Sequence, residues 1–404
     1  VALRRSRSTA PVTTFVTGQM PPGATINTIV QAALAQAIGS PGHERRFSAD
    51  VLQAAHTQFR GRLGLGQVFM MAAHANGYRG SPGERVNAGN LREVMQHAMG
   101  VPMASGLTTM SLPGILANTA NTELLGGYQE EDQTWREVAA VKNVTDFKSV
   151  TSFRMLDDME FEEVSPTGEI AHGKVSEESY SRRAKTYAKM GALTRTDFIN
   201  DDLSAFADIR SRLGRGGAQK LNRVFWTCWL SNANTFWTTA RTNYITGGTT
   251  NLADDGVGLG LGVKAFRKMK SPAADNSKVI GGMPAILLVP PELEGVADRL
   301  YQNSNLGQVA TSAANTYANK YKPVISPFLS DDSITGYSST AWWLLRNPGI
   351  AAAVVVSFLN GVQTPTIESA DADFNILGVQ FRGVWDFGCD LAEYLAGVKS
   401  KGSA

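Results

Sequence analysis

The clearest alternation of hydrophobic and polar residues lies between Phe147 and Met190. Along residues 147–162, apolar and charged side chains fall on opposite faces with a period of two, which is typical of a β-strand. A Ser-Pro-Thr-Gly turn at 165–168 separates this limb from a second one. Residues 176–189 of the second limb would also suit an amphipathic helix, but pairing with the first limb favours a strand. The pattern predicts a β-ribbon of about 65 Å at about 3.3 Å per residue, too long to pack on its own domain.

The residues after the ribbon show the hydrophobic spacing of an α-helix. An Asn-Asp-Asp cluster at 200–202 is typical of a helix N-terminus, and apolar residues then recur at helical spacing as far as Cys228. The sequence predicts one helix over 201–232, about 45 Å long at about 1.5 Å per residue. Glycines at 214, 216 and 217 interrupt its middle. Because each costs up to about 1 kcal/mol relative to alanine, a bend or a local weakness is expected there.

The N-terminal pattern is weaker. Residues 1–47 are rich in Thr, Pro, Gly and Ser, and we expect an extended arm with little core of its own. Ser48 is placed to cap a helix that carries Val51 and Ala55 on one face. A second helix is predicted from Asn90, where apolar residues again follow helical spacing.

Beyond a Thr/Asn/Gly-rich linker at 238–251, short apolar runs and helical patterns alternate. A helix is predicted at 263–270 and another enters through Pro290-Pro291, because proline suits the first helical turn. The last residues, 399–404, are predicted to be frayed. The apolar runs predict strands at 285–289, 323–325, 341–345, 351–359 and 379–386. The 404 residues are enough for two or three domains, and beyond the linker the pattern is of the α/β kind.

Composition adds two constraints. Charged residues make up 18% of the chain, below the roughly 25% of an average globular protein, which favours a surface partly used in contacts. Two cysteines, Cys228 and Cys389, imply no disulfide framework and fit a reducing site of synthesis. The longest apolar run, 349–359, is too short to span a bilayer, and no signal peptide is recognisable. We therefore expect a soluble protein without a membrane partner.

Motifs for catalysis, metals and cofactors give no site. The glycine run at 256–262 lacks the third glycine of the dinucleotide fingerprint and follows no strand, so we expect a flexible linker that enters a helix. The five histidines lack metal-ligand spacing, and the loop around Asp371 and Asp373 lacks the other calcium ligands. No Gly-x-Ser-x-Gly elbow occurs, and Cys228 between two tryptophans is typical of a core thiol. We predict no catalytic residue, metal or cofactor.

Charge is distributed unevenly. Residues 155–178 of the ribbon carry eight acids against Lys174, a net charge of −7, whereas the ribbon's root is basic at Lys148, Arg182, Arg183, Lys185 and Lys189. Eight like charges on an isolated hairpin repel one another, so this acidic segment stays solvated or meets a basic surface. We hypothesise that it docks on the long helix of a neighbouring copy. The acidic set is Asp157, Asp158, Glu160, Glu162, Glu163 and Glu169, and the basic set is Arg210, Arg212, Arg215, Lys220 and Arg223.

The first 110 residues hold ten arginines, four acids and no lysine, a net charge of +6. Arginines of this kind attract packaged DNA without sequence preference, or bridge neighbouring subunits, and both alternatives stay open. The candidate DNA-facing or subunit-bridging residues are Arg4, Arg5, Arg7, Arg45 and Arg46.

Several motifs together resemble the major capsid proteins of tailed bacteriophages, and most closely the Mu-like major head subunits, which also occur as fusions to a prohead protease. The motifs are Ser111-Leu-Pro-Gly-Ile-Leu-Ala-Asn118, Asp132-Gln-Thr-Trp-Arg-Glu-Val-Ala139, Asp146-Phe-Lys-Ser-Val-Thr-Ser152, Asn200-Asp-Asp-Leu203 and Leu213-Gly-Arg-Gly-Gly217 through Asn222-Arg-Val-Phe-Trp226. The resemblance runs from residue 111 to the C-terminus and is weaker before it.

This resemblance implies the Hong Kong 97-like capsid fold, an α+β architecture. It implies the following ranges: N-terminal arm with short helices 1–110, approach to the peripheral domain 111–146, extended β-hairpin loop 147–190, peripheral domain 191–250 with spine helix 201–232, axial α/β domain 251–362, and return to the peripheral domain 363–404. Relatives lose an N-terminal segment to a protease, and Val1 fits such a processed end. No motif for covalent cross-linking matches.

The implied function is that of a non-catalytic shell subunit that self-assembles into an icosahedral virion head around double-stranded DNA. The implied partners are other copies in hexamers and pentamers, a scaffold and the prohead protease during assembly in the host bacterial cytoplasm, then portal and decoration proteins. Two alternatives remain: an encapsulin-like nanocompartment shell of the same fold, which encloses an enzyme rather than DNA, and a nucleotide-dependent enzyme with a helical insertion.

Overall fold

The computed structural model describes twelve stretches of the chain, in two compact units. The described residues are 24–40, 43–60, 63–81, 84–87, 89–99, 112–157, 175–194, 203–270, 279, 282–305, 314–369 and 378–402. Unit 1 comprises Val1–Glu131, Tyr187–Ala218 and Thr364–Trp385, and unit 2 comprises the remainder. Helices and strands occur in both units, so the predicted α+β class is confirmed.

Unit 1 is built mainly from helices around one hydrophobic core. They are α2 (Ile26–Ile38), α3 (His43–Arg46), α4 (Ala49–Phe59), α5 (Leu65–Ala75), α6 (Leu91–Met99), α7 (Leu112–Gln129) and the first part of α10 (Leu203–Leu230). The expected extended arm is wrong for residues 24–40. Thr25 caps α2 by accepting a hydrogen bond from the backbone of Thr28, and α2 buries Ile29, Val30 and Leu34 in the core. The predicted helices after Ser48 and Asn90 are confirmed as α4 and α6.

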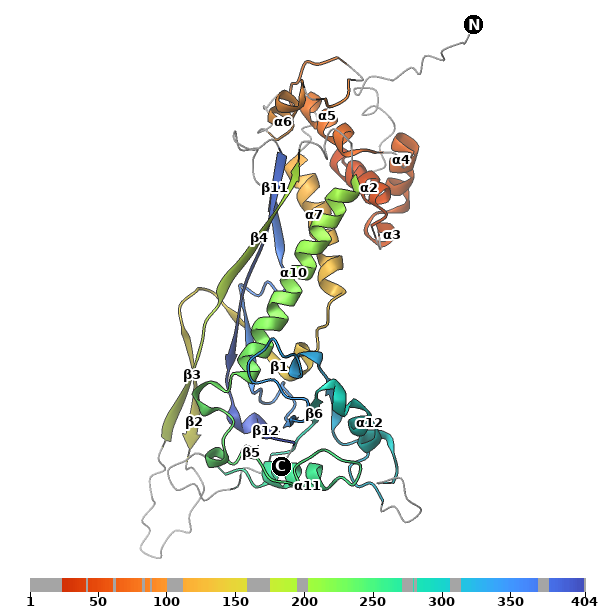
Figure 1. Ribbon diagram of the computed structural model, residues 1–404. Helices are drawn as coiled ribbons and strands as arrows, with labels where there is room; N and C mark the ends of the chain where they lie inside the picture. The colour runs from red at the N-terminus through yellow and green to blue at the C-terminus, as the bar shows by residue number, and fades with distance from the viewer. Residues whose placement is uncertain are drawn as a thin grey trace, which may run out of the picture. The chain divides into compact units, whose positions relative to one another are not determined.

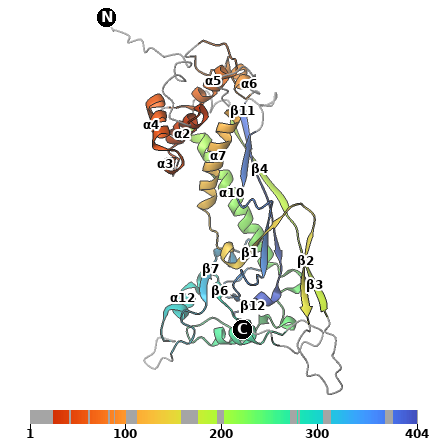
Figure 2. The ribbon, with the colours of Figure 1, turned by 180° about the vertical axis from the view of Figure 1, so that it is seen from behind.

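Two sheets and a ribbon make up the strands (Figure 1). The first sheet has the order β1-β9-β11-β10, and β4 also pairs with β11, beside which it runs in Figures 1 and 2. Its strands are β1 (Ala139–Val144), β4 (Lys185–Thr194), β9 (Val354–Leu359), β10 (Thr366–Ser369) and β11 (Gly378–Leu391). β1 runs parallel to β9, whereas β11 runs antiparallel to β9 and β10. The strands predicted at 351–359 and 379–386 are thus confirmed, the second being longer than expected.

The second sheet lies in unit 2 and has the order β5-β12-β8-β6-β7. Its strands are β5 (Tyr244–Ile245), β6 (Ile286–Val289), β7 (Lys322–Ile325), β8 (Trp342–Leu345) and β12 (Gly397–Ser400), accompanied by the helices α8 (Trp135–Val138), α11 (Val257–Arg267) and α12 (Glu294–Gln302). The predicted fraying at 399–404 is wrong for residues 399–402. β12 pairs with both β5 and β8, and Val398 and Ser400 are fully buried.

The pairing of the ribbon ends earlier at its root than the sequence pattern predicts. β2 (Val150–Asp157) and β3 (Val175–Arg182) pair antiparallel, with Val150 opposite Arg182 and Asp157 opposite Val175. The helical alternative for the second limb is excluded, but the prediction that this limb pairs with the first as far as 190 is wrong, because β4 pairs with β11. The chain changes partner at Arg183, whose backbone N–H donates to the Asp390 carboxylate. The predicted turn at 165–168 lies outside the described residues.

Helix α10 confirms the predicted long helix, but its glycines do not interrupt it. The helix is continuous over 28 residues. A methyl group on Gly214 would overlap the carbonyl oxygen of Leu124 in α7, and one on Gly127 of α7 would overlap the carbonyl oxygen of Ser211. Two helices of unit 1 therefore approach backbone to backbone at this crossing. The expected interruption is wrong, because the helix is continuous and Gly214 serves its close packing against α7.

The glycine run before α11 has the same explanation. The helix begins at Val257, so most of the expected flexible linker is helical. A methyl group on Gly258 would overlap the carbonyl oxygen of Asn251, and one on Gly262 would lie 2.6 Å from the Trp342 ring. These glycines let α11 lie close to a neighbouring loop and to strand β8. The run is a packing surface, and its backbone leaves no phosphate-binding loop.

Candidate functional site

The basic surface predicted on the long helix is smaller than its sequence implies. Arg210 is fully buried in unit 1, and its guanidinium lies over the Phe381 ring, 4.8 Å from the centroid. Burial lowers the pKa of Arg210, while the nearby Glu123 carboxylate opposes the shift. The prediction that Arg210 belongs to a docking surface is therefore wrong, because this side chain cannot meet another molecule without unpacking the core.

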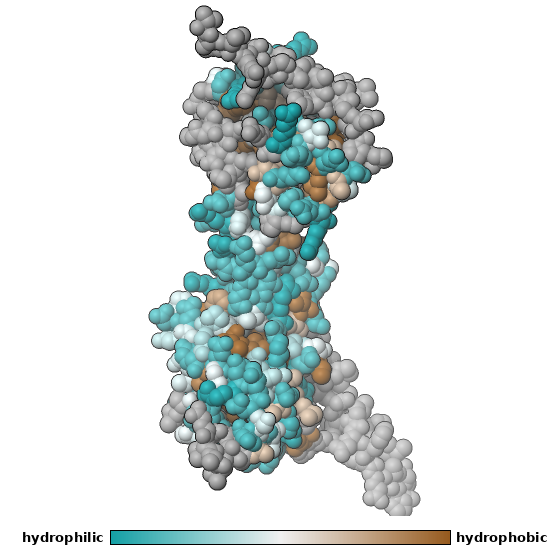
Figure 3. Space-filling view, turned by 90° about the vertical axis from the view of Figure 1, so that its right-hand side faces the viewer, coloured by the Kyte–Doolittle hydropathy of each residue, from teal (hydrophilic) through white to brown (hydrophobic). Residues whose placement is uncertain are grey.

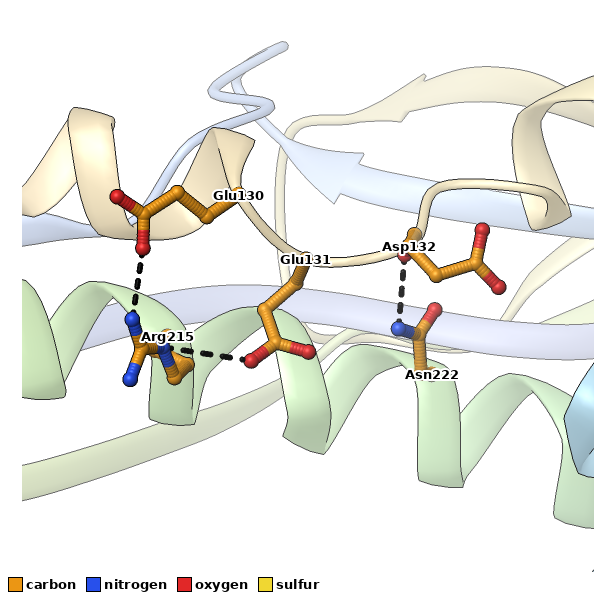
Figure 4. Close-up of polar contacts among 5 residues, drawn as sticks. All are labelled: Glu130, Glu131, Asp132, Arg215 and Asn222. Atoms are coloured by element: carbon orange, nitrogen blue, oxygen red, sulfur yellow. Dashed lines mark hydrogen bonds and ion pairs between the residues drawn. The ribbon is translucent and has the colours of Figure 1, made fainter.

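The two exposed arginines of α10 in unit 1 already contact carboxylates. Arg215 lies between two acids at the end of α7, 2.7 Å from Glu130 and 3.5 Å from Glu131 (Figure 4). Arg212 lies 3.4 Å from Asp208, one helical turn away. These exposed pairs are screened by solvent and contribute little to stability, but they reduce the free positive charge of the helix.

The part of α10 in unit 2 carries the remaining predicted cations, Lys220 and Arg223, both exposed. Arg223 reaches the hydroxyl of Ser333 at 3.4 Å. Between them, Asn222 is buried and donates a hydrogen bond of 2.9 Å to the carbonyl oxygen of Asp132 (Figure 4). Asn222 thus fixes the chain before α8 in unit 2.

The acidic side of the predicted contact is largely outside the described residues. Asp157 ends strand β2, opposite Val175. Asp158, Glu160, Glu162, Glu163 and Glu169 lie beyond the described part of the ribbon, as do Arg4, Arg5 and Arg7 of the arm. Arg45 and Arg46 are exposed on the short helix α3. Docking of the acidic segment on the helix, and the role of the arm, stay predictions.

The structure adds a pocket at the root of the ribbon, inside unit 2. It has a volume of about 340 Å³, and the polar residues that line it are Lys142 of β1, Ser181 and Arg182 of β3, and Asp390 of β11. Sequence analysis found Arg182 in the basic root but missed Lys142 and Asp390. No local signal marks those two, because the pairing of β1, β9 and β11 is what brings them to the ribbon.

The Asp390 carboxylate is the acidic group of this pocket. Its Oδ2 accepts the backbone N–H of Arg183 at 3.0 Å. Burial raises the pKa of Asp390, while that hydrogen bond and the charges of Lys185 and Arg182 oppose the rise. Asp390 is thus held in place at the root and is surrounded by cations.

A comparison with family models decides the identity of the chain. Residues 177–400, more than half of the sequence, match the family model described as phage capsid protein. The chain belongs to this family. As a phage capsid protein it is a structural component of the virion. The match covers most of β3, the helix α10, the second sheet and every strand of the first sheet except β1, and two of the five motifs that carried the resemblance lie within it.

Solved structures give weaker likenesses to the capsid protein. The capsid of a native GTA particle matches at 16% identity with a TM-score of 0.45, covering 68% of this chain and 92% of that one. Mycobacterium phage Cain matches at 12% identity with a TM-score of 0.41, covering 76% of this chain and 99% of that one. A virus-like particle from Pyrococcus furiosus matches at 12% identity with a TM-score of 0.40, covering 70% of this chain and 98% of that one. No curated protein matches. The assignment rests on the family model.

The capsid protein shows no metal cluster in its described parts, where no three His, Cys, Asp or Glu side chains are grouped to hold an ion. Among the same residues, no helix is long and apolar enough to cross a membrane. The face in Figure 3 is mostly hydrophilic, with separate hydrophobic patches among its coloured residues.

The cysteines of the capsid protein are expected to be unreactive while it is folded. Burial raises the pKa of Cys228 to about 12 and that of Cys389 well above its usual range. At pH 8 this lowers the thiolate fraction of Cys228 roughly a thousandfold relative to an unfolded chain, and iodoacetamide attacks the thiolate. Peptide mass spectrometry after timed alkylation should show this protection, with the chain in guanidinium as control. Equal rates in both states would contradict it.

Proposed function

We propose that this chain is a major capsid subunit of the Hong Kong 97-like type that self-assembles as hexamers and pentamers into an icosahedral shell around packaged double-stranded DNA. The observation that carries the proposal is the family match over residues 177–400. The proposal makes the chain structural rather than catalytic. It also includes assembly in the host bacterial cytoplasm and membership of the Mu-like branch.

The ribbon and long helix support a role in assembly. Within the described part of the chain, β2 and β3 pair with each other and with no further strand. A two-stranded ribbon is marginal on its own in water, so contact with another molecule would stabilise it. The 28-residue helix α10 begins in unit 1 and ends in unit 2. These features suit a subunit whose partner is another copy of itself.

Other partners follow from the same proposal. A scaffold and a prohead protease act during assembly, and portal and decoration proteins join the shell. The arginine-rich N-terminal segment, which includes Arg45 and Arg46 on α3, contacts DNA non-specifically or bridges subunits. The DNA contact would weaken as salt concentration rises, whereas packing between subunits would not weaken in proportion.

Expression of the full chain with its scaffold, followed by negative-stain microscopy and equilibrium sedimentation, tests the proposal. We expect closed shells, and nuclease-protected double-stranded DNA in particles from infected cells. A stable monomer that turns over a nucleotide would contradict the proposal. Shells that enclose an enzyme and no DNA would favour a nanocompartment instead.

A further inference from the structure

The pocket at the ribbon's root has a surplus of positive charge. Lys142 and Arg182 line it together with the single carboxylate Asp390, and its walls are completed by Val355 and Leu391. Arg183 and Lys185 follow Arg182 along the chain and add two more exposed cations to this root. The pocket combines apolar walls with two cations, which suits an acidic side chain whose methylene groups pack on those walls.

An unused hydrogen-bond donor lies in this pocket. The Nε of Arg182 is buried from solvent, and no acceptor among the described residues hydrogen-bonds to it. Asp390 lies nearby, but its Oδ2 accepts the backbone N–H of Arg183 instead. The Ser181 hydroxyl is engaged with that of Ser149. Buried donors in folded proteins are almost always paired, so Arg182 has hydrogen-bonding capacity that its described neighbours leave unused.

The described ends of the acidic segment lie away from this pocket along the ribbon. Arg182 is opposite Val150 at one end of the paired strands, and Asp157 is opposite Val175 at the other end. Seven residues of extended strand separate the two ends, about 23 Å at about 3.3 Å per residue. Glu178, the acid of β3 nearest to Arg182 in sequence, is four residues away, about 13 Å along the strand. This separation along the described strands favours an acid from another molecule.

We propose that the root pocket of one subunit binds a carboxylate from the acidic ribbon segment, residues 155–178, of a second copy. This inference rests on the proposed self-assembly. Each copy carries one basic pocket and one segment with a net charge of −7, so the two surfaces occur in equal numbers. A contact between different surfaces of identical chains is head-to-tail, and it forms a ring such as a hexamer or pentamer when the rotation between copies closes.

The charges of the pocket favour this occupant over nucleic acid. Asp390 would repel a run of phosphates more strongly than one carboxylate, which Lys142 and Arg182 in the same lining would attract. The pocket also competes with the exposed cations of α10 for the acidic segment. Arg215 and Arg212 there already contact carboxylates of their own chain, whereas no salt bridge involves Lys142 or Arg182 among the described residues.

A charge exchange between the two surfaces tests the proposal. The pocket variant is Lys142→Glu with Arg182→Glu, and the ribbon variant is Glu160→Lys with Glu162→Lys and Glu163→Lys. Each alone should lower the yield of assembled particles about tenfold or more, and the combined variant should recover to within about threefold of the parent, because attraction is restored with its signs reversed. Particle yield is measured by sedimentation and microscopy.

Matched controls separate this site from its rivals. Arg212→Glu with Lys220→Glu reverses exposed helix cations, and the ribbon variant should not rescue any loss it causes. Rescue of the helix variant but not of the pocket variant would overturn the proposal. So would a pocket variant that assembles normally but retains less DNA. Lys142→Gln with Arg182→Gln, checked for folding by circular dichroism, gives a milder change and should lose less yield than the reversal.

Zero-length cross-linking provides a direct test that does not depend on folding of variants. Particles assembled from equal amounts of ¹⁴N- and ¹⁵N-labelled chains are treated with a carbodiimide, which joins a lysine amine to a carboxylate as an amide. We expect mixed-isotope peptides that join Lys142 to residues 155–178. Assembled particles with no such product would overturn this inference alone. A chain that forms no oligomer would instead overturn the proposed function, and the pocket contact with it.

Discussion

Replacing Gly214 by alanine is expected to destabilise unit 1 by about 3 kcal/mol, although alanine is the better helix former. The added methyl group would overlap the carbonyl oxygen of Leu124 on α7, so one of the two helices must move. Overpacking of a close contact costs about 1–3 kcal/mol, and here the obstacle is backbone rather than a flexible side chain. Thermal unfolding should report the loss, and faster hydrogen exchange in α7 and α10 should locate it.

Gly216 is the matched control, two residues further along the same helix. It is exposed, and a methyl group there meets no atom within 4 Å. Gly216→Ala should therefore stabilise the helix by about 0.5–1 kcal/mol through the lower entropy of the unfolded chain. If both substitutions change stability by the same amount, the close approach of α7 and α10 is wrong. Gly127→Ala should repeat the Gly214 result, because it meets the carbonyl oxygen of Ser211.

Truncation of Trp229 to alanine is expected to destabilise unit 2 by about 3–5 kcal/mol, the usual cost of a large cavity in a core. Trp229 is fully buried, and the centroid of its ring lies 5.8–6.2 Å from the centroids of four other aromatic rings. Those rings belong to Phe225, Trp226, Trp237 and Trp343. The loss should appear in chemical denaturation followed by tryptophan fluorescence, and particle assembly should fall with it.

Phenylalanine substitutions separate ring packing from hydrogen bonding in this cluster. The indole N–H of Trp229 has no hydrogen-bond partner among the described residues, so Trp229→Phe should cost less than half as much as Trp229→Ala. Trp342 is the comparison, because its indole N–H donates to the carbonyl oxygen of Thr250 at 2.9 Å. Trp342→Phe should lose about 1 kcal/mol more than Trp229→Phe. Equal losses for the alanine and phenylalanine variants of Trp229 would contradict this account.

Much of the fold was predictable because hydrophobic periodicity is local. Six elements form where the sequence pattern predicts them: the helices α4, α6 and α10 and the buried strands β6, β8 and β9. Each buries one face or an apolar run, and that pattern is the same whichever element packs against it. The expected arm failed at α2 for a related reason. Its run of small apolar residues gives little amphipathic signal, yet Ala32, Ala33 and Leu34 are all buried in a helical core.

The candidate site was less predictable than the fold. The sequence showed an acidic ribbon segment and three basic regions, but the number of charges does not tell whether a side chain is buried. Arg210 has the same charge as Arg212 two residues later, and only the position of β11 places the Phe381 ring beneath Arg210 and buries it. The root pocket was invisible for the same reason, because its lysine and its carboxylate come from strands far apart in sequence.

The sequence alone determined the class of elements, the sign and position of its charges and, through motif order, the capsid family. These properties are local or are carried by residue identity, so no partner is needed to define them. Tertiary structure decided which strand each limb joins, which glycines serve helix contacts, and whether Arg210, Val398 and Ser400 face solvent or the core. Those outcomes depend on which element packs against each residue. The order of residues along the chain does not show which element that is.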